Sequence, residues 1–465
     1  MISLLTVYRE EEIMKSHLIK PFLDESYPVA DYGQGIYLYD KTGKKYIDGS
    51  SGAVTANIGH GIPEIADAMK KQAEKVSFVY RSQFTSEPAE KLANKLKDWA
   101  PGDVNWTFFV NSGSEATETA LKVAIQYWQE KGKPSKIKVL SRWMSYHGIT
   151  LGSLSMSGHV GRRARFTPLL EDFPSVEPPY CFRCPFKQTH PQCGLMCADE
   201  LERAILREGA DHIAAFIAEP VIGASGGAIV PPPGYYERIK EICDKYDVLF
   251  IADEVMTGFG RTGKRFAIDH WAVVPDIIAV GKGLTGGYAP LAATIISDKV
   301  LAPVRQGSKI IMSGHTYSAN PQATAVGLAV LNYVEKYNLT KRAEKTGDKL
   351  MSRLKNLKRH YPIIGDVRGK GLLTGVEFIS NVFNHMPFSS EVSVSKKIIS
   401  KCMDKGLLVY PASAGIEGKA GDAVLIAPPL TIIEEEINDL VTIFEESVKE
   451  VQSELQIQGY FNTVI

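Results

Sequence analysis

Two acidic residues and one lysine stand directly after two short apolar runs in the middle of the chain. Asp253 and Glu254 follow the run VLFIA (residues 248–252), and Lys282, which lies between two glycines, follows the run DIIAV (residues 276–280). Apolar runs of this length, rich in Val and Ile, are typical of strands buried on both faces of a parallel sheet. Ligands of such sheets bind beyond the carboxyl ends of the strands, so these side chains are placed for chemistry.

A lysine beyond a strand can be an ordinary surface residue or a catalytic one. The flanking Gly281 and Gly283 let the backbone approach another group closely, and residues 284–287 are all uncharged. Removal of a lysine from water favours its neutral amine, which can form a Schiff base with a carbonyl compound. These residues alone leave both interpretations open.

A loop of small polar residues precedes a helical pattern in the first third of the chain. An apolar run ends at Val110, and residues 111–114 (NSGS) lead into an apolar-periodic segment. The free N–H groups and the dipole of a helix N-terminus favour anions such as phosphate. The alternative is an ordinary N-cap with Glu115 in the first turn.

The composition limits the class of protein. A chain of 465 residues exceeds what one hydrophobic core usually supports, so two or three subdomains are expected. Basic and acidic residues number 53 each, which gives no overall attraction to nucleic acid or to an anionic membrane. No apolar run approaches the roughly 20 residues that span a bilayer. The N-terminal apolar patch is too short for a secretory signal, so we expect a cytoplasmic protein.

These segments resemble the class III aminotransferases, which are pyridoxal 5'-phosphate (PLP) enzymes of fold type I. The family pattern is a strand ending in D-E, then G-x-G-R-T-G, then a strand ending in K-G, as at residues 253–283. The similarity covers nearly the whole chain. Further matching segments are SGSEA (112–116), YHG (146–148), EP (219–220), GHTYS (314–318) and VRGKGLLTGVEF (367–378).

The resemblance implies an α/β fold with two domains. Residues 61–330 are expected to form the large PLP-binding domain, a mostly parallel sheet flanked by helices, with a cysteine-rich insertion at about residues 178–198. Residues 1–60 and 331–465 are expected to form a smaller α+β domain from both chain ends. Within the first segment, residues 1 to about 30 are expected to hold a helix and a crossing segment, and the pattern of residues 35–49 predicts a hairpin.

Four roles at the reacting centre follow from the resemblance. Lys282 is expected to hold PLP as an imine and then to move a proton between the substrate carbon and the cofactor. Asp253 is expected to pair with the pyridine nitrogen and keep it protonated. Val255 and Tyr146 are expected to pack on opposite faces of the ring.

The resemblance also assigns the phosphate and its surroundings. Ser112, Gly113 and Ser114 are expected to hold the cofactor phosphate. Thr316 is expected to reach the phosphate of the opposite subunit, which implies a homodimer with shared active sites, alone or paired into tetramers.

Two further residues are placed at the cofactor by their motifs. His147 follows the stacking tyrosine in Y-H-G, and Glu219 ends a strand in E-P. Glu219 is expected to hydrogen-bond near the cofactor or to pair with an arginine in the pocket.

The implied activity is a ping-pong transamination from an ω-amine or ω-amino acid to a 2-oxo acid such as pyruvate. The sequence departs from many relatives at two positions, because Val54 stands where ω-amine transaminases often carry tryptophan and Leu425 where many carry a carboxylate-binding arginine. Arg162, Arg163 and Arg261 remain as candidates to bind a carboxylate.

Four cysteines crowd into the insertion. Cys181, Cys184, Cys193 and Cys197 form the pattern C-x2-C-x8-C-x3-C, with His190 close by. Three interpretations stay open: a structural zinc site, a disulfide pair, or four small apolar groups filling an insertion. We assign no catalytic metal, because PLP chemistry requires none.

Rival functions come from two classes. On the same fold, an aminomutase, a racemase or a decarboxylating transaminase would need the same lysine and aspartate. An NAD-dependent dehydrogenase is a remote alternative, because residues 258–263 (GFGRTG) read as G-x-G-x-x-G and Asp276 lies at a distance where a ribose-binding acid could sit. Against it, the segment before Pro275 is too short for the required crossover helix.

Overall fold

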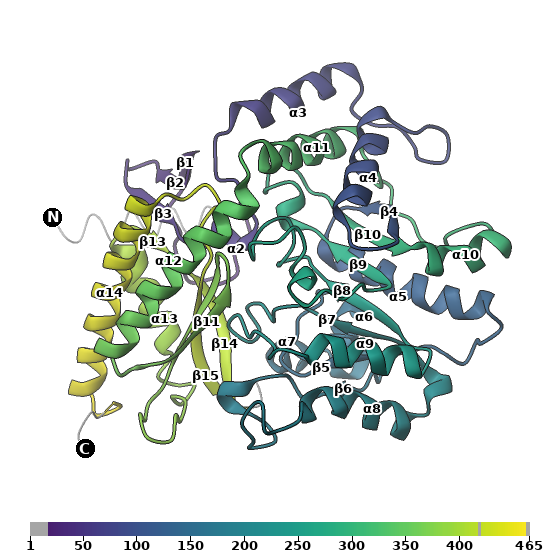
Figure 1. Cartoon of the computed structure of the whole chain (residues 1–465). Coiled ribbons are helices and arrows are strands. Elements are labelled where there is room, and N and C mark those ends of the chain that lie inside the picture. The colour runs from purple at the N-terminus through teal and green to yellow at the C-terminus, as the bar shows by residue number, and fades with distance from the viewer. Residues whose placement is uncertain (1–16, 417–419, 462–465) are drawn as a thin grey trace.

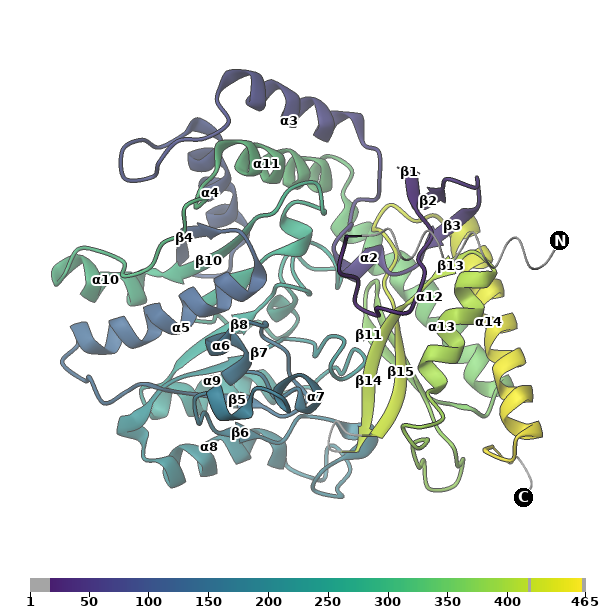
Figure 2. The ribbon, with the colours of Figure 1, turned by 180° about the vertical axis from the view of Figure 1, so that it is seen from behind.

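The protein consists of two lobes that meet along one boundary. The structure, a computed structural model, describes residues 17–416 and 420–461 (Figure 1). One lobe surrounds a seven-stranded sheet, and the other combines the first strands with the C-terminal third of the chain (Figures 1 and 2). The proposed domain limits at residues 60 and 330 stay predictions.

The large lobe is built on a sheet in which one strand runs against the others. The strands lie in the order β4-β10-β9-β8-β7-β5-β6. β10 pairs antiparallel with both β4 and β9, whereas the remaining pairs are parallel, which confirms a mostly parallel sheet. The bounds are β4 Val104–Val110, β5 Lys138–Arg142, β6 Ser175–Val176, β7 Ile213–Ala218, β8 Leu249–Asp253, β9 Ile277–Val280 and β10 Ala292–Ser297.

The central strand β8 shows why this sheet needs continuous apolar runs. Leu249 and Ile251 pack in one apolar cluster with residues of α5 (Gly113–Glu130). Phe250 and Ala252 point to the other face and join the main core with residues of α9 (Tyr235–Lys245). Because successive side chains of a strand point to opposite faces and both faces are covered by helices, every residue of β8 is buried.

Helices cover the large sheet on both faces and at its edge (Figures 1 and 2). The helix that begins at Pro63 forms as its pattern predicts, with proline in its first turn. The remaining bounds are α2 Ser51–Val54, α3 Pro63–Lys75, α4 Glu87–Trp99, α6 Leu151–Ser155, α7 Val160–Arg163, α8 Met196–Glu208, α10 Asp298–Gln306 and α11 Pro321–Lys336.

The small lobe carries two four-stranded sheets. One has the order β11-β12-β15-β14 with antiparallel pairs, and the other has the order β1-β2-β3-β13. β13 pairs in parallel with β3, so a strand near the end of the chain extends the sheet of its beginning. The bounds are β1 Ala30–Gln34, β2 Tyr37–Asp40, β3 Lys45–Asp48, β11 Ile364–Lys370, β12 Leu373–Phe378, β13 Leu407–Leu408, β14 Tyr410–Ile416, β15 Ala420–Ile426, α12 Leu339–His360, α13 Val394–Asp404 and α14 Glu434–Ile457.

The N-terminal segment differs in part from its prediction. The predicted hairpin is present as β2 and β3, but β1 adds a strand before it, and that strand is mostly exposed and has no apolar alternation to announce it. Residues 17–29 contain no helix, and the first 16 residues lie outside the described part of the chain. Pro21 and Pro28 oppose a helix in this stretch because proline disfavours helical backbone in the residue before it.

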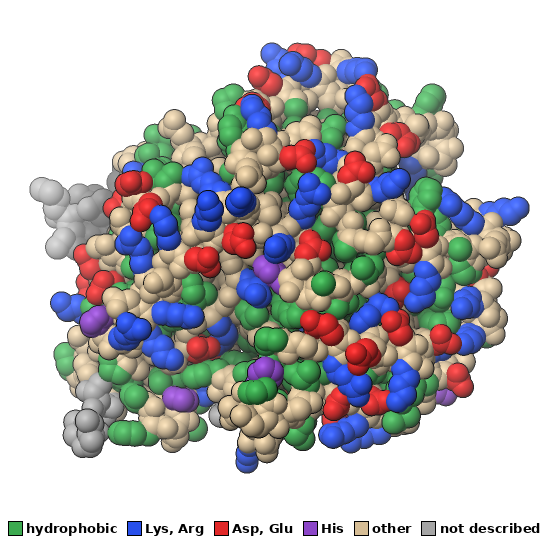
Figure 3. Space-filling model, viewed as in Figure 1, with side chains coloured by type: hydrophobic (Ala, Val, Ile, Leu, Met, Phe, Trp, Pro, Cys, Tyr) green, Lys and Arg blue, Asp and Glu red, His purple; other side chains and the backbone are tan. Residues whose placement is uncertain are grey.

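The surface carries no dominant charge on the face shown in Figure 3. Lys and Arg side chains are interspersed with Asp and Glu over both lobes on that face, as the equal counts of the two kinds lead one to expect. In residues 17–416 and 420–461, we find no helix long and apolar enough to cross a membrane.

A buried ionic network joins the cysteine-rich insertion to the small lobe. Glu377 on β12 is fully buried and accepts hydrogen bonds from Arg183 Nε at 2.6 Å and from Arg368 Nη1 at 2.7 Å. Tyr180 also donates its hydroxyl to Glu377. A buried carboxylate needs such partners, because its removal from water is compensated only by paired charges and hydrogen bonds.

Loss of this carboxylate is expected to destabilise the protein strongly. In Glu377→Gln the buried Arg183 loses its anionic partner and Arg368 keeps only Asp366, so the free energy of unfolding should fall by about 3–5 kcal/mol. Thermal unfolding of the variant and the parent protein, run side by side, should show a drop of several degrees. The control is Glu74→Gln, which breaks an exposed pair with Lys70 and should cost less than about 1 kcal/mol. Equal shifts in the two variants would contradict the prediction.

Candidate active site

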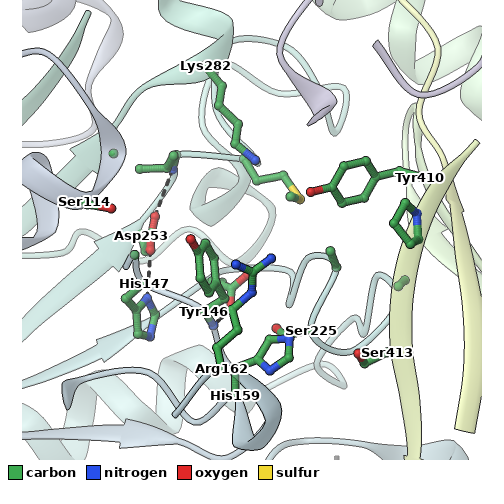
Figure 4. Close-up of a pocket in the computed structure, with 18 of the residues that line it drawn as sticks. Ser114, Tyr146, His147, His159, Arg162, Ser225, Asp253, Lys282, Tyr410 and Ser413 are labelled. Carbon is green, nitrogen blue, oxygen red and sulfur yellow. Dashed lines mark hydrogen bonds and ion pairs between the residues drawn. The ribbon is translucent and has the colours of Figure 1, made fainter. Parts of the chain in front are cut away.

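Three neighbouring parallel strands end at one cavity. Glu219 follows β7, Asp253 ends β8, and Lys282 lies two residues beyond β9. All three side chains line a cavity of about 510 Å³ (Figure 4). Two acids and one amine from separate parts of the chain thus meet at the carboxyl edge of the sheet, as the two apolar runs predicted for Asp253 and Lys282.

Lys282 is held in an unusual backbone conformation. Its φ is 41°, in the left-handed region that a residue with a side chain rarely adopts, at a cost of order 1–3 kcal/mol. The conformation begins the short 3-10 helix Lys282–Leu284 and directs the amine into the cavity (Figure 4). No hydrogen bond or ion pair to its Nζ is found within residues 17–416 and 420–461.

Burial sets the charge state of this amine. Desolvation lowers the pKa of Lys282 to about 8, against the opposing effect of the carboxylates Asp253 and Glu219. A larger share of neutral amine is therefore present near neutral pH than in an exposed lysine. Neutral amine is the nucleophilic form.

Asp253 is fixed by two hydrogen bonds. Its Oδ2 lies 2.7 Å from Nδ1 of His147, and its Oδ1 accepts the backbone N–H of Val255 at 3.0 Å. The other ring nitrogen of His147, Nε2, is buried and has no hydrogen-bond partner within the described residues. The carboxylate is thereby oriented at the cavity wall by groups that leave its cavity side free.

Glu219 is a buried acid held by backbone donors. Its Oε1 accepts the N–H of Tyr146 at 3.0 Å, and its Oε2 accepts the N–H of Gly223 at 2.8 Å. Burial raises the pKa of Glu219, and the nearby Asp253 adds to this effect. The side chain therefore positions the Tyr146 backbone while lying at the cavity itself.

The N-terminus of α5 approaches the cavity without side-chain bulk. Gly113 and Ser114 line it, and a Cβ placed on Gly113 would lie 2.7 Å from Cγ1 of Val255, so only glycine fits there. Ser112 is the N-cap, and its side chain accepts the N–H of Glu115 at 3.3 Å. The cap uses one backbone N–H of the first turn. The other N–H groups of that turn remain free to bind a ligand.

The opposite wall comes from the small lobe. Tyr410, Ser413 and neighbouring residues of β14 face the cavity across from Tyr146 (Figure 4). Gly421 on β15 and Ser395 on α13 complete this side. The cavity therefore exists only where the two lobes meet.

Comparison with known proteins identifies the family. Residues 24–448 match the family model described as aminotransferase class-III. The chain is a class III aminotransferase. The aminotransferase is 54% identical over 443 residues to an uncharacterised aminotransferase of Bacillus subtilis, YodT, with 95% of this chain and 100% of that protein covered.

Two further relatives connect the aminotransferase to named activities. It is 33% identical over 442 residues to the putrescine–pyruvate aminotransferase of Pseudomonas aeruginosa, with 93% of this chain and 94% of that protein covered. The solved structure of the ω-transaminase of Pseudomonas jessenii in complex with PMP is 33% identical and superposes with a TM-score of 0.89, over 97% of this chain and 99% of that one. These matches confirm the predicted family, the enzyme class and fold type I.

Most of the predicted site residues of the aminotransferase meet at the cavity. Gly113, Ser114, Tyr146, His147, Glu219, Asp253, Val255 and Lys282 line it. Ser112 caps α5 instead of facing the cavity. Thr316 is exposed and lies outside the cavity of its own chain.

Three charged residues singled out from the sequence have other partners. Glu254 is buried and accepts hydrogen bonds from the Thr257 hydroxyl and the Ile268 N–H. Arg163 donates to carbonyl groups of residues 154, 155 and 157. Arg261 is buried and donates to the carbonyls of Leu372 and Pro428. Of the three arginine candidates, Arg162 is the one that lines the cavity.

The dehydrogenase alternative lacks its crossover helix. After residues 258–263 the chain forms only the 3-10 helix Ala267–Trp271 before β9 begins at Ile277. The Asp276 carboxylate accepts a hydrogen bond from the N–H of Phe250 on β8 and pairs with Lys299. Its role is therefore to stabilise the sheet.

Several cavity residues lie outside the family motifs of the sequence. His159, Ser225, Met256, Tyr410 and Ser413 line the cavity, yet none of them belongs to a motif quoted from the sequence. Val54, where relatives often carry tryptophan, is buried on α2 and does not line it. Which residues lie near the cavity depends on how the two lobes pack together, and local sequence patterns do not encode that packing.

The cysteines of the insertion carry free thiols. Cys197 is buried in the main apolar core, and burial, with smaller effects of the neighbouring thiols, raises its pKa to about 12. Within residues 17–416 and 420–461, no group of three His, Cys, Asp or Glu side chains is placed to hold a metal ion. Apolar filling accounts for Cys197, but not for Cys181, which is exposed, or for Cys184 and Cys193, which are partly exposed.

The pKa of Lys282 can be checked by chemical labelling of the cofactor-free protein. Reaction of its amine with acetic anhydride, followed by mass spectrometry across a pH series, should give an apparent pKa of about 8. In Asp253→Asn the profile should move to lower pH, because the lost carboxylate had favoured the charged amine. An unchanged profile, or one that moves to higher pH, would refute this assignment of cause. Lys264, an exposed lysine, gives the internal reference.

Proposed function

We propose that this aminotransferase is a PLP-dependent transaminase that moves an amino group from an ω-amine or ω-amino acid to a 2-oxo acid such as pyruvate. The observation that carries the proposal is the meeting of a desolvated lysine amine, a histidine-supported aspartate and an open helix N-terminus at one cavity. These are the groups needed to bind an aldehyde, a ring nitrogen and a phosphate, respectively.

The residues present fit PLP. Gly113 forms a cradle against Val255 that a Cβ would fill, which leaves the end of α5 open for a phosphate. Asp253 keeps a carboxylate oxygen at the cavity wall for a protonated ring nitrogen. Tyr146 presents an aromatic ring at the cavity for stacking. Lys282 supplies the amine that would hold the aldehyde carbon.

The proposed chemistry divides between the cofactor and the chain. When bound, PLP supplies an electron sink that stabilises negative charge on the substrate carbon next to the nitrogen. The neutral amine of Lys282 would take the proton from that carbon as a general base and donate it to the cofactor as a general acid. Asp253 favours the protonated state of the ring nitrogen, because a nearby carboxylate stabilises a positive charge. His147 holds Asp253 in place for this task.

The order of substrates follows from a single cavity. In the proposed ping-pong sequence, the donor enters and leaves as a carbonyl compound before the 2-oxo acid enters the same cavity. The choice of donor and acceptor is supported by the named relatives, a putrescine–pyruvate aminotransferase and an ω-transaminase.

We also propose that the active unit is a homodimer. Large apolar side chains are exposed around the segment that carries Thr316, namely Phe78, Tyr80, Phe84, Ile310, Met312 and Tyr317. Exposed apolar groups in such numbers are typical of an interface with another chain. Thr316 would then serve the phosphate site of the partner subunit, since it is exposed and absent from its own cavity.

Visible absorbance is the first test of the function. The protein incubated with PLP should become yellow, bleach when an ω-amine is added, and regain the colour with pyruvate. Lys282→Ala should lose the covalent link and at least about 100-fold of the activity, because it removes both the nucleophile and the general base. Lys264→Ala, outside the cavity, should behave as the parent protein.

Absence of the yellow colour in the parent protein would reject the cofactor and the function together. Product formation without any 2-oxo acid would instead favour an aminomutase or a racemase, which need no acceptor. Release of carbon dioxide from the donor would favour a decarboxylating transaminase.

The proposed dimer has its own test. Analytical ultracentrifugation should give a species of twice the mass of one chain, or of a multiple of that dimer. Thr316→Val should weaken PLP binding on the order of 10-fold by removing one hydrogen bond to a charged group, whereas Thr316→Ser should retain it. A monomer with normal PLP affinity would rule out the shared site.

A further inference from the structure

Arg162 is a cation at the cavity wall without an anionic partner. It lies in the short helix α7 and lines the cavity together with Lys282, and these two are the Lys and Arg residues of the lining within residues 17–416 and 420–461. No hydrogen bond or ion pair of its guanidinium occurs among the residues that the structure describes. Arg162 is exposed to solvent, and its guanidinium is a positive charge at the cavity wall that can bind an anion.

An aromatic ring holds this guanidinium in place. The Cζ atom of Arg162 lies 4.9 Å from the ring centroid of Tyr146, within the range of a cation–π contact. Such a contact uses the face of the guanidinium and leaves the N–H donors at its edge free. Those donors match the two oxygens of a carboxylate.

Neither acid of the cavity forms an ion pair with Arg162 in the described part of the chain. Both oxygens of Asp253 are engaged by His147 and the Val255 N–H. Both oxygens of Glu219 are engaged by the backbone N–H groups of Tyr146 and Gly223. The carboxylate of a molecule that enters the cavity can therefore pair with Arg162.

Two polar residues, Ser225 and His159, lie near Arg162 at the cavity wall. Ser225 is only 3% exposed and lines the cavity, yet its Oγ has no hydrogen-bond partner within the described residues. His159 packs edge-on against Tyr146, and burial together with Arg162 lowers its pKa, so it adds no second cation near neutral pH. Figure 4 shows Arg162, His159 and Ser225 between Tyr146 and β14.

The position at which many relatives carry a carboxylate-binding arginine holds no cation in this chain. Leu425, which stands where those relatives carry an arginine, is fully buried on β15 and does not line the cavity. Arg163 and Arg261 donate to backbone carbonyls and do not line it either. Apart from Lys282, Arg162 is thus the cation that the described residues place at the cavity wall.

We infer that Arg162, assisted by the Ser225 hydroxyl, is the subsite that binds the substrate carboxylate. The inference rests on the proposed transaminase function and deepens it, because it assigns the aminotransferase substrates that carry a carboxylate apart from the reacting nitrogen or carbonyl group. Two sources present this chemistry: the carboxylate of the 2-oxo acid acceptor and the far carboxylate of an ω-amino acid donor.

The test compares matched substrates in the separate half-reactions, followed by visible absorbance of the PLP-loaded protein. The donors are 4-aminobutyrate and n-butylamine, in which a methyl group replaces the carboxylate, and the acceptors are pyruvate and acetaldehyde, in which hydrogen replaces it. In Arg162→Met, kcat/KM for a carboxylate substrate should fall about 10- to 100-fold, the usual effect of losing a charge-assisted hydrogen-bond pair. Values for n-butylamine and acetaldehyde should change less than about threefold. Arg162→Lys should lose less than Arg162→Met, and Ser225→Ala about three- to tenfold.

Arg165→Met is the matched control. Arg165 is an exposed arginine three residues away that does not line the cavity, so all four substrates should react as with the parent protein. A second readout is binding: butyrate, which cannot react, should inhibit the n-butylamine reaction, and its inhibition constant should rise in Arg162→Met by the same factor as for the carboxylate substrate.

Each outcome decides the inference separately from the function. A loss confined to 4-aminobutyrate assigns the subsite to the donor, a loss confined to pyruvate assigns it to the acceptor, and a loss with both shows that the two carboxylates bind there in turn. Equal losses for all four substrates would show that Arg162 only positions Tyr146, and would overturn the inference, as would no loss at all. A protein that reacts with n-butylamine keeps the proposed function in either case.

Discussion

The burial of one amine beyond β9 is the constraint on which the site depends. Lys282 adopts a φ of 41° and has a pKa lowered to about 8 by desolvation. The surrounding sheet stabilises Lys282 in this conformation and environment, because three buried strands end together and present Glu219 and Asp253 to the same cavity. A lysine in this state is a better nucleophile and base than one in water.

Small residues around the lysine make this arrangement possible. A Cβ on Gly283 would lie 2.8 Å from Nδ2 of Asn57, and a Cβ on Gly113 would lie 2.7 Å from Val255. The backbone of the large lobe therefore packs closely against the N-terminal segment on one side and against α5 on the other. Close packing excludes water, and exclusion of water is what shifts the pKa of Lys282.

The two lobes contribute different kinds of group to the cavity. The large lobe supplies the charged and hydrogen-bonded residues at strand ends, and β14 and β15 supply a wall of mostly small residues with Tyr410. Arg261 and the Glu377 network fasten one lobe to the other through buried hydrogen bonds. The reacting groups thus lie on one lobe, and the wall opposite them lies on the other.

The sequence by itself determined the family, the mostly parallel sheet and the meeting of Asp253 and Lys282. Those features are encoded locally, because a buried strand needs a continuous apolar run and the residue after it lies at the carboxyl edge of the sheet. Only the tertiary structure decided that Arg162 faces the cavity whereas Arg163, its neighbour, binds backbone carbonyls. It also brought in Ser225 and Tyr410, because which loops and strands meet across two lobes depends on packing between segments far apart in the chain.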